Sequence, residues 1–172
     1  MKRLQIEPRK RRMVHSQPGE FQSRCITLFV RAAAVFSLPR SIGQVYGLLF
    51  ATPRPLNLDE LIAMLGSSRG GTHDAIKWLM HIGAVERVHL PGVRKEHYRA
   101  ELNLRKLAAG YLRLKVEPHV ENGADHIGEL ADSIDPSDAE AEFQSQRLDK
   151  IRAWHRVVSG LLPMVKQIAE DR

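Results

Sequence analysis

The first strong hydrophobic pattern along the chain is a helical stripe between residues 20 and 37. Its apolar members recur three and four positions apart, the spacing of one face of an α-helix; they are Phe21, Cys25, Leu28, Phe29, Ala32, Ala33 and Phe36. A second helix is predicted from Pro39 to the "PRP" at 53–55, because proline suits the first turn of a helix and a later proline ends one. Gly43 and Gly47 leave one face of this helix without side chains, so we expect a neighbouring backbone to lie close there.

Two short helices on a tight turn follow. Asn57 with Glu60 three residues later forms a capping box, and Gly66 is placed to end this third helix in a left-handed turn. Ser68 is a suitable cap for a fourth helix over 68–82. Two short helices joined by about three residues are typical of a helix-turn-helix.

A hairpin is predicted immediately after the fourth helix. The segments "AVERVHL" (84–90) and "EHYRAEL" (96–102) are rich in strand-forming residues and flank "PGVRK" (91–95), whose Pro-Gly pair favours a turn. A helix-turn-helix followed by a two-stranded hairpin defines a winged helix, and the wing predicted here is the segment 90–96 between the two strands. The predicted fold class is mainly α with a small β-hairpin: a winged helix-turn-helix domain and a C-terminal helical dimerisation region.

The last third of the chain is predicted to be helical with two interruptions. A helix over 103–116 is expected to loosen at 117–126, a short helix covers about 127–134, and "DPSD" (135–138) supplies the cap and proline that begin a long helix. Along that helix six apolar residues form the narrow seam of a helix that packs on another helix, with a kink expected near Ser159 and Gly160. The seam contains Ile151, Trp154, Val158, Leu161, Val165 and Ile168.

Charge divides the chain unevenly. Residues 1–100 carry a net charge of +9, and residues 101–172 carry −3, within a total of +6. This asymmetry indicates that the first part meets a polyanion, although an uneven distribution by chance is the alternative. The predicted organisation is a basic flexible arm at 1–18, a DNA-binding domain at 19–101, and a helical dimerisation and possible effector region at 102–172. The arm could contact phosphates, remain a solvated tail or act as an address.

Several classes of protein are not expected. The single cysteine, Cys25, cannot form an internal disulfide, and the most apolar window carries Arg31 at its middle, so we expect a cytoplasmic protein without a membrane segment. The stretch "GSSRGGTH" lacks the Lys-Ser/Thr ending of a phosphate-binding loop, and no nucleophile and base are paired. We therefore expect no enzyme, no catalytic residues and no cofactor. Histidines 73, 81, 89 and 97 recur too far apart to share a metal ion, and a looser acidic cluster around His119 and His126 is a weaker candidate.

The outward face of the fourth helix is the main candidate for binding chemistry. With Ile76 inward, this face carries Gly70, Gly71, Asp74, Lys77, Trp78 and His81, with His73 at its border. An α-helix fits the major groove of DNA, where polar side chains meet base edges and phosphates. Arg69 lies in the first turn, where backbone N–H groups favour phosphate. Asp74 opposes this interpretation unless it accepts a hydrogen bond from cytosine, and a merely solvated face is the alternative.

Residues 38–101 resemble the winged-helix region of GbsR-type regulators within the MarR group. The resemblance rests on "PRSIGQVYGLL", "LGSSRG" and "PGVRKEHY" in that order, over more than a third of the chain. It implies a dimeric bacterial transcription regulator, usually a repressor, whose fourth helix reads the major groove while the wing contacts the backbone or minor groove. The DNA-contacting residues it implies are Ser68, Arg69, Gly71, His73, Lys77, Arg94 and Lys95.

This chain departs from the family pattern at three positions of the fourth helix. Members tend to carry Asn at the position of Gly71, Ser at His73 and Asn at Ala75, so the operator sequence does not transfer. Some relatives respond to choline-like ligands, and such a cation would require an aromatic cage. The aromatic residues of the second half, Tyr111, Phe143 and Trp154, are better interpreted as core or dimer seam, which leaves a possible small-molecule effector of unknown identity. The alternative function is a winged-helix protein–protein adaptor that does not read DNA sequence.

Overall fold

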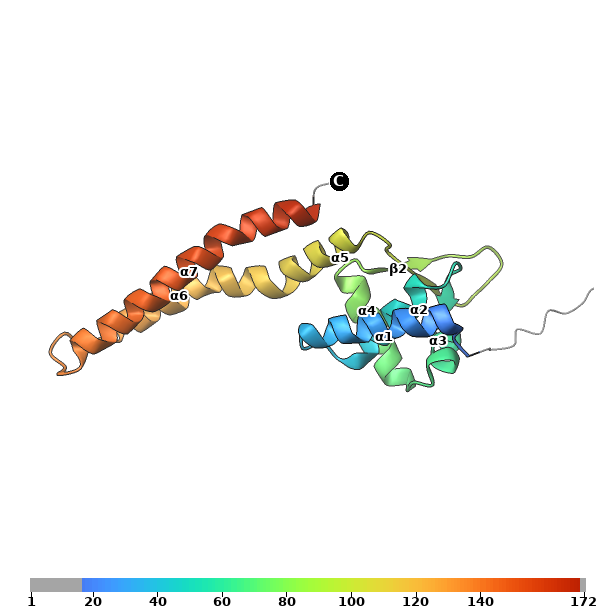
Figure 1. Cartoon of the computed structure of the whole chain (residues 1–172), viewed down its shortest axis with the longest axis horizontal. Helices are drawn as coiled ribbons and strands as arrows, with labels where there is room; N and C mark the ends of the chain where they lie inside the picture. The colour runs from blue at the N-terminus through green and yellow to red at the C-terminus, as the bar shows by residue number, and fades with distance from the viewer. Residues whose placement is uncertain (1–16, 171–172) are drawn as a thin grey trace, which may run out of the picture.

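The structure consists of a head of short helices and strands, residues 20–100, and a long helical arm, residues 104–170 (Figure 1). The computed structural model describes residues 17–170. The basic flexible segment predicted at residues 1–18 therefore lies outside the described residues, except for its last two positions. The head contains α1 (Glu20–Val35), α2 (Arg40–Phe50), β1 (Leu56–Asn57), α3 (Leu58–Leu65), α4 (Arg69–His81), β2 (Val85–Val88) and β3 (His97–Ala100). The remainder contains α5 (Leu104–Tyr111), the π-helical segment η1 (Leu112–Val116), α6 (Glu117–Asp132) and α7 (Ala141–Glu170).

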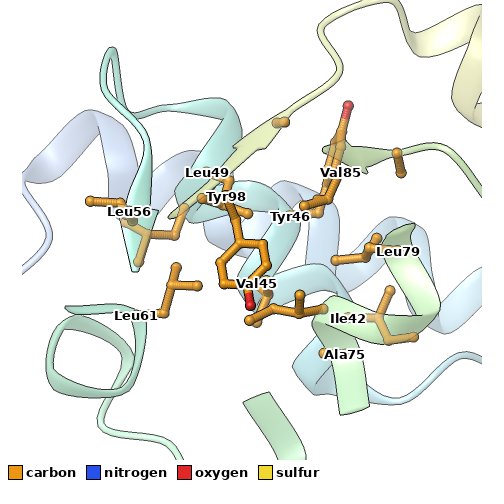
Figure 2. Packing of buried hydrophobic residues seen from close by; sticks show 14 of the residues in the cluster. Ile42, Val45, Tyr46, Leu49, Leu56, Leu61, Ala75, Leu79, Val85 and Tyr98 are labelled. Carbon is orange, nitrogen blue, oxygen red and sulfur yellow. The ribbon is translucent and has the colours of Figure 1, made fainter. Parts of the chain in front are cut away.

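The core of the head surrounds α2. Tyr46 and Leu49 of this helix pack with residues from α3, α4 and the sheet, among them Leu61, Leu79 and Tyr98 (Figure 2). These side chains are almost completely removed from solvent. Burial of each large aliphatic side chain contributes roughly 1.5–3 kcal/mol, so this cluster stabilises the helix-turn-helix and the sheet as one unit.

The glycine face predicted for α2 does receive a neighbouring backbone. A Cβ atom on Gly43 would lie 2.5 Å from the carbonyl oxygen of Phe29, and one on Gly47 would lie 2.7 Å from the Cα atom of Ile26. Both neighbours belong to α1, which therefore packs directly on the glycines. Side chains at these two positions would force the helices apart.

The apolar stripe predicted for α1 contains both buried and exposed residues, which divide between two faces of the helix. Cys25 and Ala33 are buried against α2, whereas Phe21 is 67% exposed and Leu28 is 62% exposed. The glycine face of α2 admits only a narrow strip of α1, and hydrophobic spacing alone did not reveal how wide that contact would be. Together with Val35, the two exposed residues form a stripe with a spacing of seven.

The predicted hairpin of the wing forms from β2 and β3, and a further strand extends it to a three-stranded antiparallel sheet. The strand order is β1-β3-β2, with Leu56 opposite Tyr98 and Val88 opposite His97. The added strand, β1, has only two residues, which is too short for an alternating pattern to appear in the sequence.

The helix after the wing does not loosen at 117–126 as predicted. The segments α5, η1 and α6 follow one another without a break from Leu104 to Asp132. Pro118 has no N–H to donate, and the π-helical turn before it changes the hydrogen-bonding pattern: Glu117 N–H bonds to Leu112 O, five residues back. This change lets the helix continue through the proline.

The long C-terminal helix begins at Ala141 and not directly after Asp135. The Asp135 carboxylate accepts hydrogen bonds from the backbone N–H and the hydroxyl of Ser137, at 2.8 and 2.7 Å, and so stabilises a turn instead of a helix start. From Ala141 the helix continues without interruption past Ser159, Gly160 and Pro163 to Glu170.

Helices α6 and α7 form an antiparallel hairpin that extends away from the head (Figure 1). The contact between them is partly polar: a ring nitrogen of His155, Nε2, lies 2.8 Å from the carbonyl oxygen of Val120, and Lys166 pairs with Glu117. The predicted apolar seam of α7 lies elsewhere on the helix and is not covered, since Trp154 is 69% exposed and Ile168 is 64% exposed. Within the described residues, no helix is both long and apolar enough to cross a membrane.

Candidate nucleic-acid interface

The turn between α3 and α4 is locked by its own side chains. Asn57 and Glu60 form the predicted capping box at the start of α3, and Gly66 ends that helix in the left-handed conformation, with φ of 61°. Ser68 caps α4 by accepting a hydrogen bond from the Gly71 N–H at 3.2 Å. Thr72 is fully buried and donates to the Ser68 carbonyl at 2.9 Å. The start of α4 is therefore held in one position relative to α3.

Helix α4 has a buried face and a polar face. Ala75, Ile76 and Leu79 are buried in the core. His73, Asp74, Lys77 and His81 are exposed, as predicted from the helical wheel. Trp78 differs from the prediction: it is half-buried, and its ring centroid lies 6.5 Å from that of Tyr111 on α5. Helix α5 reaches this side of α4, so Trp78 is not part of the polar face.

The wing projects its cations at the end of the hairpin. Pairing between β2 and β3 ends at Val88 and His97, so residues 89–96 form an exposed loop that turns at Gly92, where φ is 74°. Arg94 and Lys95 are both exposed on this loop. His97 is buried, and its Nδ1 atom lies 2.9 Å from the carbonyl oxygen of Lys95. That contact holds the backbone next to Lys95.

Carboxylates neutralise many of the cations on this side of the head. Arg87 pairs with Glu96 at 2.7 Å, and Arg99 pairs with Glu86 at 2.6 Å, both within the wing. Arg69 and Lys95 bind the two oxygens of one carboxylate, that of Asp59, each at 2.7 Å. Within residues 17–170, Lys77 and Arg94 form no ion pair, which leaves both charges open to a polyanion.

Two tyrosines near the sheet have raised pKa values. Burial, and secondarily the charge of Glu101, raises the pKa of Tyr46 to about 12, and its hydroxyl donates to the Glu101 backbone carbonyl at 2.7 Å. Burial also raises the pKa of Tyr98, with a further contribution from its hydrogen bond to Glu96 at 2.9 Å. Both phenols are therefore neutral donors at physiological pH and stabilise the sheet without adding charge.

The structure brings only some of the predicted residues together. Ser68, Arg69 and Gly71 cluster at the start of α4, and Lys95 of the wing reaches the same place through Asp59. Sequence reasoning missed Asp59, which resembles an ordinary acidic residue in a first helical turn. The sequence carries no separate signal for this contact, which arises because Asn57, the last residue of β1, pairs with His97 and α3 begins directly after it.

The aromatic residues considered for a ligand cage do not meet. Phe143 and Trp154 are exposed on α7, while Tyr111 contacts Phe36, with 4.9 Å between ring centroids. Tyr111 lines an apolar cavity of about 530 Å³ between the head and α5, together with Phe36 and Trp78. Among the described residues, no group of three His, Cys, Asp or Glu side chains is arranged to hold a metal ion.

Comparison with solved structures supports this fold. A solved crystal structure of a transcriptional regulator superimposes with a TM-score of 0.56 at 22% identity, over 85% of this chain and 98% of that one. The chain therefore shares the fold of that structure, with a winged helix-turn-helix as its head. No family model matches the chain.

The chain is also similar to two proteins from Bacillus subtilis (strain 168) that are named as helix-turn-helix (HTH) regulators. YvaV, named as an HTH-type transcriptional regulator, and OpcR, named as an HTH-type transcriptional repressor, are each 29% identical to this chain over 66 residues. The aligned part is 38% of this chain. It covers a little over a third of the length of these curated relatives, 37% and 36% respectively.

Proposed function

We propose that this protein is a sequence-specific, double-stranded DNA-binding transcriptional regulator of the GbsR type, a repressor that acts as a homodimer in the cytoplasm. The carrying observation is the polar face of α4, which stands exposed beside the cations of the wing while its opposite face is buried in the core. That arrangement suits insertion of residues 68–82 into the major groove and contact of residues 90–96 with the adjacent backbone or minor groove.

The proposed roles follow from position and charge. Lys77 lies on the exposed face of α4 without an ion pair within the described residues, so it is the best candidate for reading a base edge. Arg94 and Lys95 extend from the wing and are assigned to phosphate. Ser68, Arg69 and Gly71 lie where the N–H groups of the first helical turn favour a phosphate, and His73 borders the same face.

A homodimer is proposed because apolar stripes remain uncovered on two helices. Phe21, Leu28 and Val35 are exposed seven residues apart on α1; Trp154, Leu161 and Ile168 repeat that spacing on α7. A spacing of seven residues suits packing of one helix along another. In such a dimer the two α4 helices would lie about 34 Å apart and bind a pseudo-palindrome. The cavity at Tyr111 is the proposed site for a small apolar effector.

Selection from a random duplex pool followed by a salt titration tests this function. We expect one enriched sequence and an affinity that falls steeply as salt rises, because bound cations release counterions from DNA. The double variant Arg94→Ala with Lys95→Ala should weaken binding to every duplex and reduce the salt slope by about two. Lys77→Ala should instead change the ratio between selected and scrambled duplexes by about ten-fold.

Lys150→Ala is the matched control, since it removes one exposed charge from α7, outside the helix-turn-helix and the wing. Equal affinity of the wild type for all duplexes, together with a stoichiometric protein partner, would favour the adaptor function instead. A uniform loss in Lys77→Ala would reassign that residue to phosphate.

A further inference from the structure

One carboxylate joins the recognition helix to the wing. Arg69, the first residue of α4, donates from Nη2 to Asp59 Oδ1 at 2.7 Å, and Lys95 of the wing donates from Nζ to Asp59 Oδ2 at 2.7 Å. Asp59 itself belongs to α3. Helix α3, helix α4 and the wing therefore meet at one side chain.

The backbone places Asp59 at this position. It occupies the first turn of α3, where the helix dipole favours a carboxylate, and the Asn57 capping box fixes that turn. The β1–β3 pairing of Asn57 with His97 brings the chain beyond β1 alongside the wing segment that precedes β3. His97 holds the Lys95 backbone through its ring, so the approach of Lys95 to Asp59 is set by the sheet.

The cations retain unused donors while they hold Asp59. An Arg side chain has five N–H donors and a Lys side chain has three, so each can bind the carboxylate and a second anion together. Their side chains are 68% and 64% exposed, and both are accessible from solvent. A DNA phosphate presents two non-bridging oxygens, as a carboxylate does, and fits between two converging cations.

We propose that Asp59 is a positioning residue that makes Arg69 and Lys95 one phosphate-binding clamp instead of two independent contacts. This inference rests on the proposed function. Without Asp59, two long side chains would each lose conformational freedom when they bind DNA, and the wing loop would lose a tie to the helix-turn-helix. With Asp59 present, the benefit of this ordering exceeds the repulsion between the Asp59 carboxylate and the phosphate, because the two cations lie between the two anions.

A double-mutant cycle tests the clamp. The full-length wild type, Arg69→Ala, Lys95→Ala and the double variant are titrated by fluorescence anisotropy with the selected duplex and a scrambled duplex of equal length. Each single change should weaken binding to both duplexes by about five-fold, and the double variant should bind only slightly more weakly than either, because each change alone disables the clamp. A double loss equal to the product of the single losses would overturn the proposal.

Removal of the carboxylate gives an independent readout. Asp59→Asn should weaken both duplexes by about five-fold, and Asp59→Glu, which retains the charge, should recover part of the loss. Asp149→Asn is the matched control: it removes one exposed carboxylate from α7, where the contact is with Arg152 at 3.8 Å, and should not weaken binding. Tighter binding by Asp59→Asn would overturn the proposal and make Asp59 a competing counter-ion.

The two proposals fail in different ways. A wild type that binds neither duplex in a salt-dependent manner contradicts the proposed function itself. A wild type that binds, combined with independent effects of Arg69 and Lys95, contradicts only the clamp. Thermal melting of every variant identifies loss of fold. The double-mutant cycle of Arg69 and Lys95 keeps Asp59, so it tests the clamp even if the Asp59→Asn variant does not fold.

Discussion

The head and the arm keep their apolar side chains in different places. In the head, Tyr46, Leu61 and Leu79 are buried in a core shared by helices and sheet. In the arm, Trp154 and Leu161 of α7 are exposed, and the contact with α6 includes His155 and an ion pair. The head therefore forms its core within one chain and leaves the stripe of Phe21, Leu28 and Val35 on α1 exposed beside it. The arm leaves a large part of its hydrophobic surface uncovered, as expected of a surface that packs against a partner.

The strongest way to test this difference is to place charge on the uncovered seam. Trp154→Glu combined with Leu161→Glu should raise the dissociation constant of the proposed dimer roughly thousand-fold, because two carboxylates would be buried without partners. Both residues are exposed in the single chain, so its helical content should not change. Sedimentation equilibrium and far-UV circular dichroism measure the two effects.

Ser145→Glu is the control for that variant, since it introduces a carboxylate at an exposed position of α7 outside the seam. It should leave the oligomeric state unchanged. A double seam variant that associates as strongly as the wild type would show that α7 does not form the interface.

Two glycines of the continuous helix α5–η1–α6 allow the packing at the junction of head and arm to be compared with the packing within the arm. A Cβ atom at Gly110 would lie 2.0 Å from the carbonyl oxygen of Ile82, at the end of α4, whereas one at Gly128 would have no neighbour within 4 Å. Gly110→Ala should lower the free energy of unfolding by about 3 kcal/mol, because a backbone atom must move. Gly128→Ala should raise it by about 0.5–1 kcal/mol through helix propensity. Urea denaturation compares them, and equal effects would contradict the tight junction.

The smallest expected effect concerns a polar group inside the head. Tyr46→Phe removes the hydrogen bond to Glu101 and should cost about 1 kcal/mol of stability. Because the pKa of Tyr46 is raised from 10.0 to about 12 in the folded state, the stability linked to its proton is present below pH 10 and is lost as pH rises through 12. Melting temperatures of the wild type should therefore fall more steeply than those of Tyr46→Phe across that range. Parallel curves would contradict this linkage.

Local signals predicted the winged helix correctly where the physics is local. The capping box at Asn57, the left-handed Gly66 and the Ser68 cap concern hydrogen bonds within a few residues, and all three appear in the structure. The close approach at Gly43 was also predictable, since the absence of a side chain is visible in the sequence. The fold class follows from the order of these elements.

The errors occurred where distant segments compete for the same surface. Exposure of Phe21 depends on how narrowly α1 packs on α2, and burial of Trp78 depends on a helix that begins more than twenty residues later. The uninterrupted helix around Pro118 depends on a π-helical turn that propensities do not indicate. Periodicity identifies apolar faces, but it does not identify the element that covers them.

The sequence by itself determined the order of the helices and the hairpin in the winged helix, the charge of the wing and the polar face of α4, because these depend on neighbouring residues and on side-chain type. Only the tertiary structure decided that Asp59 joins Arg69 to Lys95, and that the α7 seam remains uncovered. Strand register and helix packing bring these groups together or keep them apart, and both arise from contacts between residues that are distant in the sequence.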